Sequence, residues 1–132
     1  MRIRPARPDL LLAAIAKGHV LLLSSEMAVE LARVLRYPRP QRLFGLTEEQ
    51  VYNYVQFLKE VTLPIIPDHT LAVPIRDSQD AVLLQTAVSG EADIICTVDR
   101  DFYDSDTIAF CATSGIDVCD DIELARRIAN AP

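Results

Sequence analysis

Cysteine is scarce in this sequence. Its three cysteines, Cys96, Cys111 and Cys119, are an odd number and lack the Cys-x-x-Cys spacing of a metal site. Cys96 and Cys119 lie inside apolar runs, which favours small buried side chains over reactive thiols. Because unpaired thiols persist in a reducing compartment, we expect a cytoplasmic protein.

Long apolar runs, repeats, low-complexity tracts and long linkers are missing as well. No apolar run approaches the roughly 20 residues of a membrane-spanning helix, because Lys17, Gly18 and His19 separate the clusters at 10–12 and 20–23. The basic start is not followed by a clear signal-peptide core. Half of the 132 residues are hydrophobic, enough for a core without disulfide bonds. We therefore expect one domain over residues 1–132 and no membrane contact.

Positive charge is the smaller share of the charged residues. The 13 Lys and Arg stand against 19 Asp and Glu, for a net charge of −6, which argues against general nucleic-acid binding. The distribution is uneven, because residues 1–42 carry eight basic side chains and three acids, whereas residues 43–132 carry five and sixteen. One surface that faces a polyanion would explain this difference, and so would an arginine-rich helix exposed to solvent.

Helical and strand-like segments alternate along the chain. Helices are expected over 9–16, 26–36, 47–58, 77–88 and after Asp120 or Asp121, and short apolar strands over 20–23, 64–67, 93–98 and 116–119. Ser24 or Ser25 caps the second helix, Pro38 and Pro40 end it, and Thr47–Gln50 fits a capping box. This alternation predicts an α/β fold, a parallel sheet flanked by helices on both faces, with ligands outside the carboxyl ends of its strands.

Three pairs of acids fall at that edge of the predicted sheet: Asp99 and Asp101, Glu26 and Glu30, and Asp77 and Asp80. The first pair comes just past a strand, in the stretch TVDRDF (97–102). The second pair lies on the helix after another strand, four residues apart and so on one helix face. The third pair opens a third helix. If the strands are parallel, all three pairs face one rim of the sheet.

Each pair also has a local explanation: a helix cap for Asp77 and Asp80, an Asx-turn for Asp99 and Asp101, and an exposed carboxylate near Arg33 for Glu30. Taken singly, the pairs favour these local roles. Their convergence on one rim favours a shared role, because clustered carboxylates repel one another unless a cation lies between them.

Carboxylate oxygens without a nearby histidine or cysteine ligand suit Mg²⁺ or Mn²⁺. The two histidines, His19 and His69, are not in register with these acids. One or two such ions lower the pKa of water and stabilise in-line attack on a phosphodiester. Asp99 would then be a metal ligand at a strand end, and Asp101 would bind a second ion or orient a water molecule.

Four stretches resemble, in order, the PIN-domain ribonucleases, and among them the toxins of toxin–antitoxin systems: SSEMAVELARVLRYPR (24–39), RLFGLTEEQV (42–51), IRDSQDAVLLQTAVSGEADIICTVDRDF (75–102) and GIDVCDDIEL (115–124). The resemblance implies a helix-flanked parallel sheet and an acidic site that binds Mg²⁺ or Mn²⁺ and cleaves single-stranded RNA. It implies that Glu30, Asp80 and Asp99 are catalytic and bind metal, with Asp77 and Asp101 as further metal ligands.

One part of the family pattern is missing. Members begin with an apolar strand that ends in an Asp-Thr-Asn or similar triplet, and residues 1–4 are too short to supply it. We expect either that Met1 is an internal methionine of a longer reading frame or that the chain is a degenerate form. On both accounts the sheet lacks its first, central strand, and the remaining acids bind metal less well.

Two functions follow from the resemblance. The first is a metal-dependent endoribonuclease, as the toxin of a toxin–antitoxin pair, with an antitoxin protein as partner. The second is a non-catalytic module that binds RNA or protein through Arg33, Arg36, Arg39 and Arg42. A phosphoacceptor domain ranks behind both, because Lys17 and Lys59 do not follow a late strand. We also expect a homodimer, to which Leu43, Phe44, Tyr54 and Phe57 would contribute, although core packing suits most of these.

Overall fold

The structure of the protein is a computed structural model that describes residues 8–130. Its helices are α1 (Pro8–Ala16), α2 (Ser25–Val34), α3 (Pro38–Phe44), α4 (Glu48–Val61), α5 (Ser78–Ser89), α6 (Ser105–Thr113) and α7 (Asp121–Asn130), together with the 3₁₀ helix η1 (Arg100–Tyr103). Its strands are β1 (Leu22–Leu23), β2 (Leu63–Pro64), β3 (Ile94–Cys96) and β4 (Asp117–Cys119).

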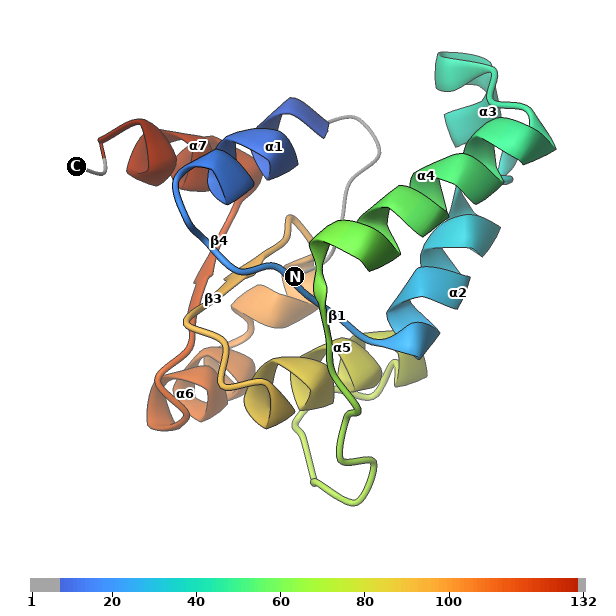
Figure 1. Cartoon of the computed structure of the whole chain (residues 1–132). Helices are drawn as coiled ribbons and strands as arrows, with labels where there is room; N and C mark the ends of the chain where they lie inside the picture. Colours follow the sequence, from blue (N-terminus) through green and yellow to red (C-terminus); the bar gives the residue numbers. More distant parts are fainter. Residues whose placement is uncertain (1–7, 131–132) are drawn as a thin grey trace.

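The strands pair in parallel, and helices flank them, as predicted (Figure 1). β1 pairs with β2 and β3 with β4, so the described residues form two small sheets in place of one continuous sheet. The carbonyl oxygens of Leu21 and Leu23 accept hydrogen bonds from the amides of Leu63 and Ile65 at 2.7 and 2.9 Å. Because these two carbonyls face β2, the N–H and C=O groups of Leu22 between them point away from β2. A cavity of about 570 Å³ lies beside the starts of β1 and β3. The expected absence of a first strand concerns residues 1–7, which lie outside the described residues.

Two hydrophobic cores lie on the two faces of the β3–β4 pair. Successive residues of β3, Ile95 and Cys96, belong to different cores, because the side chains of a strand alternate between its faces. One core is built mainly from α1, α2, α4, α7 and β1, and the other from α5, η1 and α6. Figure 1 shows α1 beside α7 on one side of the strands and α5 and α6 on the other.

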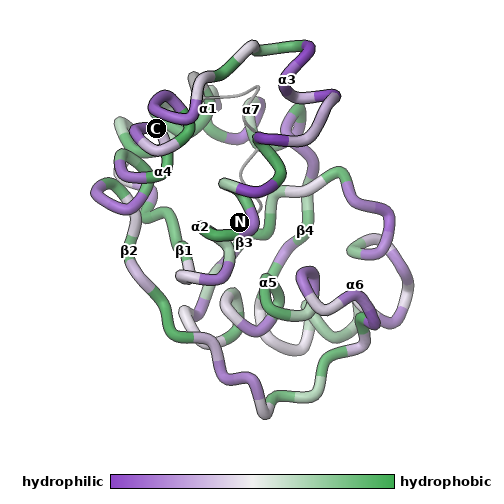
Figure 2. Tube along the Cα trace, turned by 90° about the vertical axis from the view of Figure 1, so that its right-hand side faces the viewer, coloured by the Kyte–Doolittle hydropathy of each residue, from purple (hydrophilic) through white to green (hydrophobic). Residues whose placement is uncertain are grey.

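The helices other than α3 bury one face each, and in Figure 2 hydrophobic and hydrophilic residues alternate along them. The predicted capping box is confirmed, because Thr47 accepts from the amide of Gln50 at 3.1 Å and the Gln50 side chain accepts from the amide of Thr47 at 2.8 Å. Ser24 caps α2 through the amide of Met27 at 3.2 Å. Local hydrogen bonds that the sequence predicts therefore set where these helices begin.

Three elements were not predicted: α3, η1 and α6. Pro38 does not only follow α2 but also begins α3, where the missing amide proton and fixed φ of proline suit the first helical turn. Gly45 ends α3 in the left-handed conformation, at φ 56°. Helix α6 gave a weak pattern because its buried residues are Thr107 and Cys111, one of them polar.

All three cysteines are free and buried, as predicted for Cys96 and Cys119. Burial raises the pKa of Cys111 and Cys119, which keeps these thiols protonated and unreactive. Among residues 8–130, no helix has the length and apolar character needed to cross a membrane.

Candidate metal centre

Asp77 and Asp80 lie at the start of α5. The Asp77 side chain caps this helix, accepting from the amides of Gln79 and Asp80 at 2.9 and 3.0 Å. The predicted capping role of Asp77 is therefore confirmed. The cap places Asp80 in the first helical turn, where only 3% of it is exposed and where the positive end of the helix dipole favours a carboxylate.

Asp99 lies between β3 and η1, as the cap of η1, and Asp101 lies in the first turn of η1. Thr97 accepts from the amide of Asp99 at 3.1 Å, and the Asp99 carboxylate accepts from the amide of Asp101 at 3.2 Å, which confirms the predicted turn. The Tyr103 hydroxyl donates to the carbonyl of Thr97 at 2.6 Å, and burial raises the pKa of Tyr103, so the hydroxyl keeps its proton. Phe102 is fully buried below the turn and anchors it.

These local arrangements bring three acids together. Carboxylate oxygens of Asp80, Asp99 and Asp101 lie within 4.8 Å of one another, from a buried, a half-buried and an exposed side chain. Asp80 comes from the capped start of α5, and Asp99 and Asp101 come from the turn after β3. Local hydrogen bonds hold both segments in place. Hard carboxylate oxygens in such a group fit Mg²⁺ or Mn²⁺, because both ions prefer oxygen ligands.

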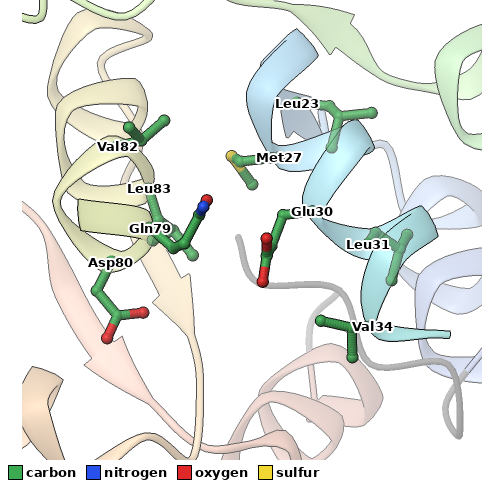
Figure 3. Close-up of a pocket in the computed structure, with 9 residues that line it drawn as sticks. All are labelled: Leu23, Met27, Glu30, Leu31, Val34, Gln79, Asp80, Val82 and Leu83. Atoms are coloured by element: carbon green, nitrogen blue, oxygen red, sulfur yellow. The ribbon is translucent and has the colours of Figure 1, made fainter. Parts of the chain in front are cut away.

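Glu30 lies close to this group but outside it. Its carboxylate forms an ion pair with Arg33, one turn further along α2. The Glu30 side chain is 20% exposed and lines a pocket between α2 and α5, with Asp80 on the opposite wall at the same end (Figure 3). Glu26 points elsewhere, since its carboxylate lies 3.2 Å from Nε2 of His69. The predicted convergence therefore includes Asp80, Asp99 and Asp101, with Glu30 nearby.

The pocket between α2 and α5, here called the α2–α5 pocket, measures about 90 Å³. Its walls are mainly apolar and come from Leu23, Met27, Leu31, Val34, Val82 and Leu83, with Glu30, Gln79 and Asp80 as the polar residues. Met27 was predicted only as part of the apolar stripe of its helix, and Gln79 was not predicted to belong to a site. The spacing of Met27, Leu31 and Val34, which share the face of α2 that carries Glu30, was the signal that could have identified this wall.

Of the four arginines at 33–42, Arg33 lies in α2, Arg36 in the link between α2 and α3, and Arg39 and Arg42 in α3. Arg33 is bonded to Glu30, and Arg36 donates to both carboxylate oxygens of Glu48 at 2.9 Å. Arg36 lowers the pKa of Glu48 through these hydrogen bonds. Arg39 and Arg42 are exposed on α3 and form no ion pair with any residue in the range 8–130. Ion pairs thus neutralise the charges of Arg33 and Arg36, whereas the charges of Arg39 and Arg42 are available to a ligand.

A family model described as the PIN domain matches residues 3–101 of the chain, which is most of its length. No curated protein and no solved structure gives a significant match. The family match confirms the resemblance to the PIN domain over the first three sequence stretches, of which it omits only residue 102, and the fourth stretch, 115–124, lies outside it. It assigns an α/β fold of the nuclease type, and proteins with this domain typically depend on a divalent metal ion.

Proposed function

This chain belongs to the PIN domain family, and on that premise we propose that it is a metal-dependent endoribonuclease that cleaves single-stranded RNA. The observation that carries this proposal is the approach of the Asp80, Asp99 and Asp101 carboxylates to within 4.8 Å of one another. They lie at the carboxyl ends of the strands, where parallel α/β sheets bind their ligands.

Asp80, Asp99 and Asp101 would hold the divalent ion, Mg²⁺ or Mn²⁺. Such an ion lowers the pKa of a water molecule and offsets the charge of the phosphate that is attacked. The chain itself contributes rigid positions: the first turn of α5 orients Asp80, and the hydrogen bonds among Thr97, Asp99 and Asp101 hold the turn after β3. Because these groups are held before substrate arrives, little reorganisation is needed when a phosphate binds.

Glu30 and Asp77 were also predicted to be metal ligands, and Glu30 to be catalytic. Glu30 is bonded to Arg33, and Asp77 uses its carboxylate to cap α5. We assign Asp77 to positioning Asp80 and Glu30 to the wall of the α2–α5 pocket that faces the substrate.

Single-stranded RNA is the substrate that this surface suits best. The α2–α5 pocket opens beside the acids, and an unpaired base can reach such a pocket whereas a base stacked in a duplex cannot. The exposed Arg39 and Arg42 on α3 add positive charge for the phosphate backbone.

The test is cleavage of labelled single-stranded RNA with Mg²⁺ or Mn²⁺, comparing wild type with Asp99→Asn and Asp93→Asn. Both aspartates flank β3, but Asp99 follows it in the acidic group and Asp93 precedes it as an exposed side chain. We expect Asp99→Asn to lower the rate by roughly 100-fold or more, since loss of a mere supporting partner of a ligand costs about 10–100-fold. Equal rates for wild type and Asp99→Asn would refute the assignment.

The same assay addresses the alternative of a non-catalytic binding module. RNA that binds with a steep salt dependence but is never cut would favour that module.

The proposal extends to location and partners. The buried free cysteines support a cytoplasmic location, and the family resemblance supports a role as the toxin of an antitoxin pair. For a homodimer, Leu43 and Phe44 are the better contributors, at 66% and 40% exposed, because Tyr54 packs against the core. Phe57, which is 36% exposed, is intermediate between the exposed Leu43 and Phe44 and the partly buried Tyr54.

A further inference from the structure

The 3₁₀ helix η1 carries two exposed residues beside its acids, Arg100 and Tyr103. They are three positions apart, and because a 3₁₀ helix has three residues per turn, their side chains start from the same side of η1. Phe102 points into the core and is fully buried, which fixes how η1 is turned about its axis. Arg100 and Tyr103 therefore belong to one side of the element that also holds Asp101 and that Asp99 caps.

The Tyr103 ring is held at one end and is still open to solvent. Its hydroxyl donates to the carbonyl of Thr97 at 2.6 Å, while 43% of the residue is exposed. The hydroxyl oxygen of Thr97 accepts from the amide of Asp99 at 3.1 Å, so one residue links the ring to the acidic group. An unpaired base can stack on an exposed aromatic ring, and a ring that is already fixed loses little conformational freedom when it does so.

The charges around η1 suit a base at the ring and a phosphate at the guanidinium. Burial raises the pKa of Tyr103 most, and the nearby Asp120 carboxylate raises it further, so negative charge lies near the hydroxyl. This charge repels a phosphate from that end of the ring, whereas a base is neutral. Arg100 is exposed and forms no ion pair with any other residue in the range 8–130. Its guanidinium group can therefore bind a phosphate through two hydrogen bonds.

The acidic group itself needs a positive charge close to it before RNA can approach. The carboxylates of Asp80, Asp99 and Asp101 carry three negative charges, and one divalent ion would leave one of them without a counter-charge. Arg100 lies in the sequence between Asp99 and Asp101 and supplies a positive charge at this place. A phosphate that Arg100 binds is thereby brought next to the acids.

We propose that η1 is an RNA-binding site in which one unpaired base stacks on the Tyr103 ring and Arg100 binds an adjacent phosphate. Neither residue lines the α2–α5 pocket, so this site is separate from it. Every base has a face that can stack, and the site therefore accepts single-stranded RNA of any sequence. The inference rests on the proposed ribonuclease function and specifies how the strand is held beside the acidic group.

Tyr103→Trp tests the stacking, because the chain has no tryptophan and the variant has a single indole. The variant is titrated without metal, so that no RNA is cleaved, with oligoadenylate and with an abasic RNA of the same length. We expect oligoadenylate to quench the indole fluorescence with a dissociation constant about tenfold lower than that of the abasic RNA. Tyr52→Trp is the matched control, at a tyrosine of α4 that is 63% exposed, and should show no quenching. Equal quenching of the two variants, or none in Tyr103→Trp, would overturn the inference.

Tyr103→Phe and Tyr103→Leu separate stacking from support of the turn. Phenylalanine keeps the ring and loses the hydrogen bond to Thr97, so this variant should keep nearly the wild-type RNA affinity. Leucine has no ring, and its variant should bind oligoadenylate about tenfold more weakly. Urea denaturation compares the stability of both variants. An equal loss of RNA affinity in the two would mean that Tyr103 acts only through its hydroxyl, which contradicts the proposal.

Arg100→Gln tests the phosphate contact. The slope of log affinity against log salt concentration should become shallower by about 0.7, the contribution of one phosphate contact on a single strand. Lys59→Gln removes an exposed positive charge from the last turn of α4 and should leave the slope as it is in the wild type. A wild-type slope in Arg100→Gln would refute the contact.

Failure of this inference and failure of the proposed function give different results. Cleavage by Tyr103→Leu and Arg100→Gln with the KM of the wild type would refute the η1 site and leave the nuclease assignment intact. The expected quenching and salt slopes, together with no cleavage under any metal, would support the η1 site and favour the non-catalytic binding module.

Discussion

The two ends of the strands carry cavities that differ in size and in chemistry. The cavity beside the starts of β1 and β3 measures about 570 Å³, whereas the α2–α5 pocket at the carboxyl end measures about 90 Å³. The large cavity adjoins the helix ends at Gly18 and Gly90, and carbonyl groups at helix C-termini disfavour anions. The small pocket adjoins the start of α5 and the turn before η1, where backbone amides hold carboxylates. The backbone polarity of the surrounding elements, rather than the size of a cavity, thus indicates where an acidic site forms.

The two ends of the strands should differ most in how far the loss of a buried side chain lowers the free energy of unfolding. Phe102 is fully buried below the acidic turn, and Ile128 of α7 lines the large cavity at 5% exposure. We expect Phe102→Ala to lower the free energy of unfolding by about 3–5 kcal/mol, and Ile128→Val by about 0.5–1.5 kcal/mol. Urea denaturation measures both values. A loss for Phe102→Ala no larger than that for Ile128→Val would mean that the turn is not anchored as described.

A second effect belongs to the amino end. A Cβ atom on Gly90 would lie 2.7 Å from Cδ1 of Leu22 and 3.0 Å from Cγ1 of Ile65, so Gly90→Ala forces these side chains to shift. We expect the free energy of unfolding to fall by about 1–3 kcal/mol. RNA cleavage per folded molecule should stay unchanged, because the clash lies away from the acids. A selective loss of cleavage would show that the two ends are coupled.

A smaller effect separates two helix caps at the carboxyl end. Asp77 caps α5, and Asp120 caps α7 by accepting from the amide of Glu123 at 2.8 Å. Asp77→Ala and Asp120→Ala should each lower the free energy of unfolding by about 1 kcal/mol. Only Asp77→Ala should also weaken Mn²⁺ binding, by roughly tenfold, since its cap orients Asp80. Calorimetric titration with Mn²⁺ compares them, and equal metal affinities would remove Asp77 from the supporting role.

The smallest expected effect is a pH dependence of stability that arises at Glu123, outside the group of Asp80, Asp99 and Asp101. Hydrogen bonds from Arg126 and Arg127 lower the pKa of Glu123 to about 2 from an ordinary value of 4.5. A depressed folded-state pKa adds stability that is present above pH 4.5 and disappears as the pH falls toward 2. Glu123→Gln should therefore flatten the fall of the urea midpoint between these pH values. An unchanged slope would mean that solvent screens the exposed pairs completely.

Much of the site was predictable because its parts are local. A cap residue three positions before Asp80 and a turn residue two positions before Asp101 form hydrogen bonds with nearby amides, and such bonds depend on short stretches of sequence. The α/β class and the parallel direction of the strands were predictable for the same reason, since apolar runs and helical periodicity are local patterns. Helix α3 was missed because a proline that ends one helix can also begin the next.

The amino-acid sequence by itself determined which residues are acidic, which segments become helix or strand outside α3, η1 and α6, and which family the chain belongs to. Only the tertiary structure decided that Asp80 meets Asp99 and Asp101, and that a small pocket lies between α2 and α5. The physical reason is distance along the chain: contacts between segments some 20 to 50 residues apart arise from the packing of helices on strands, which no single segment encodes.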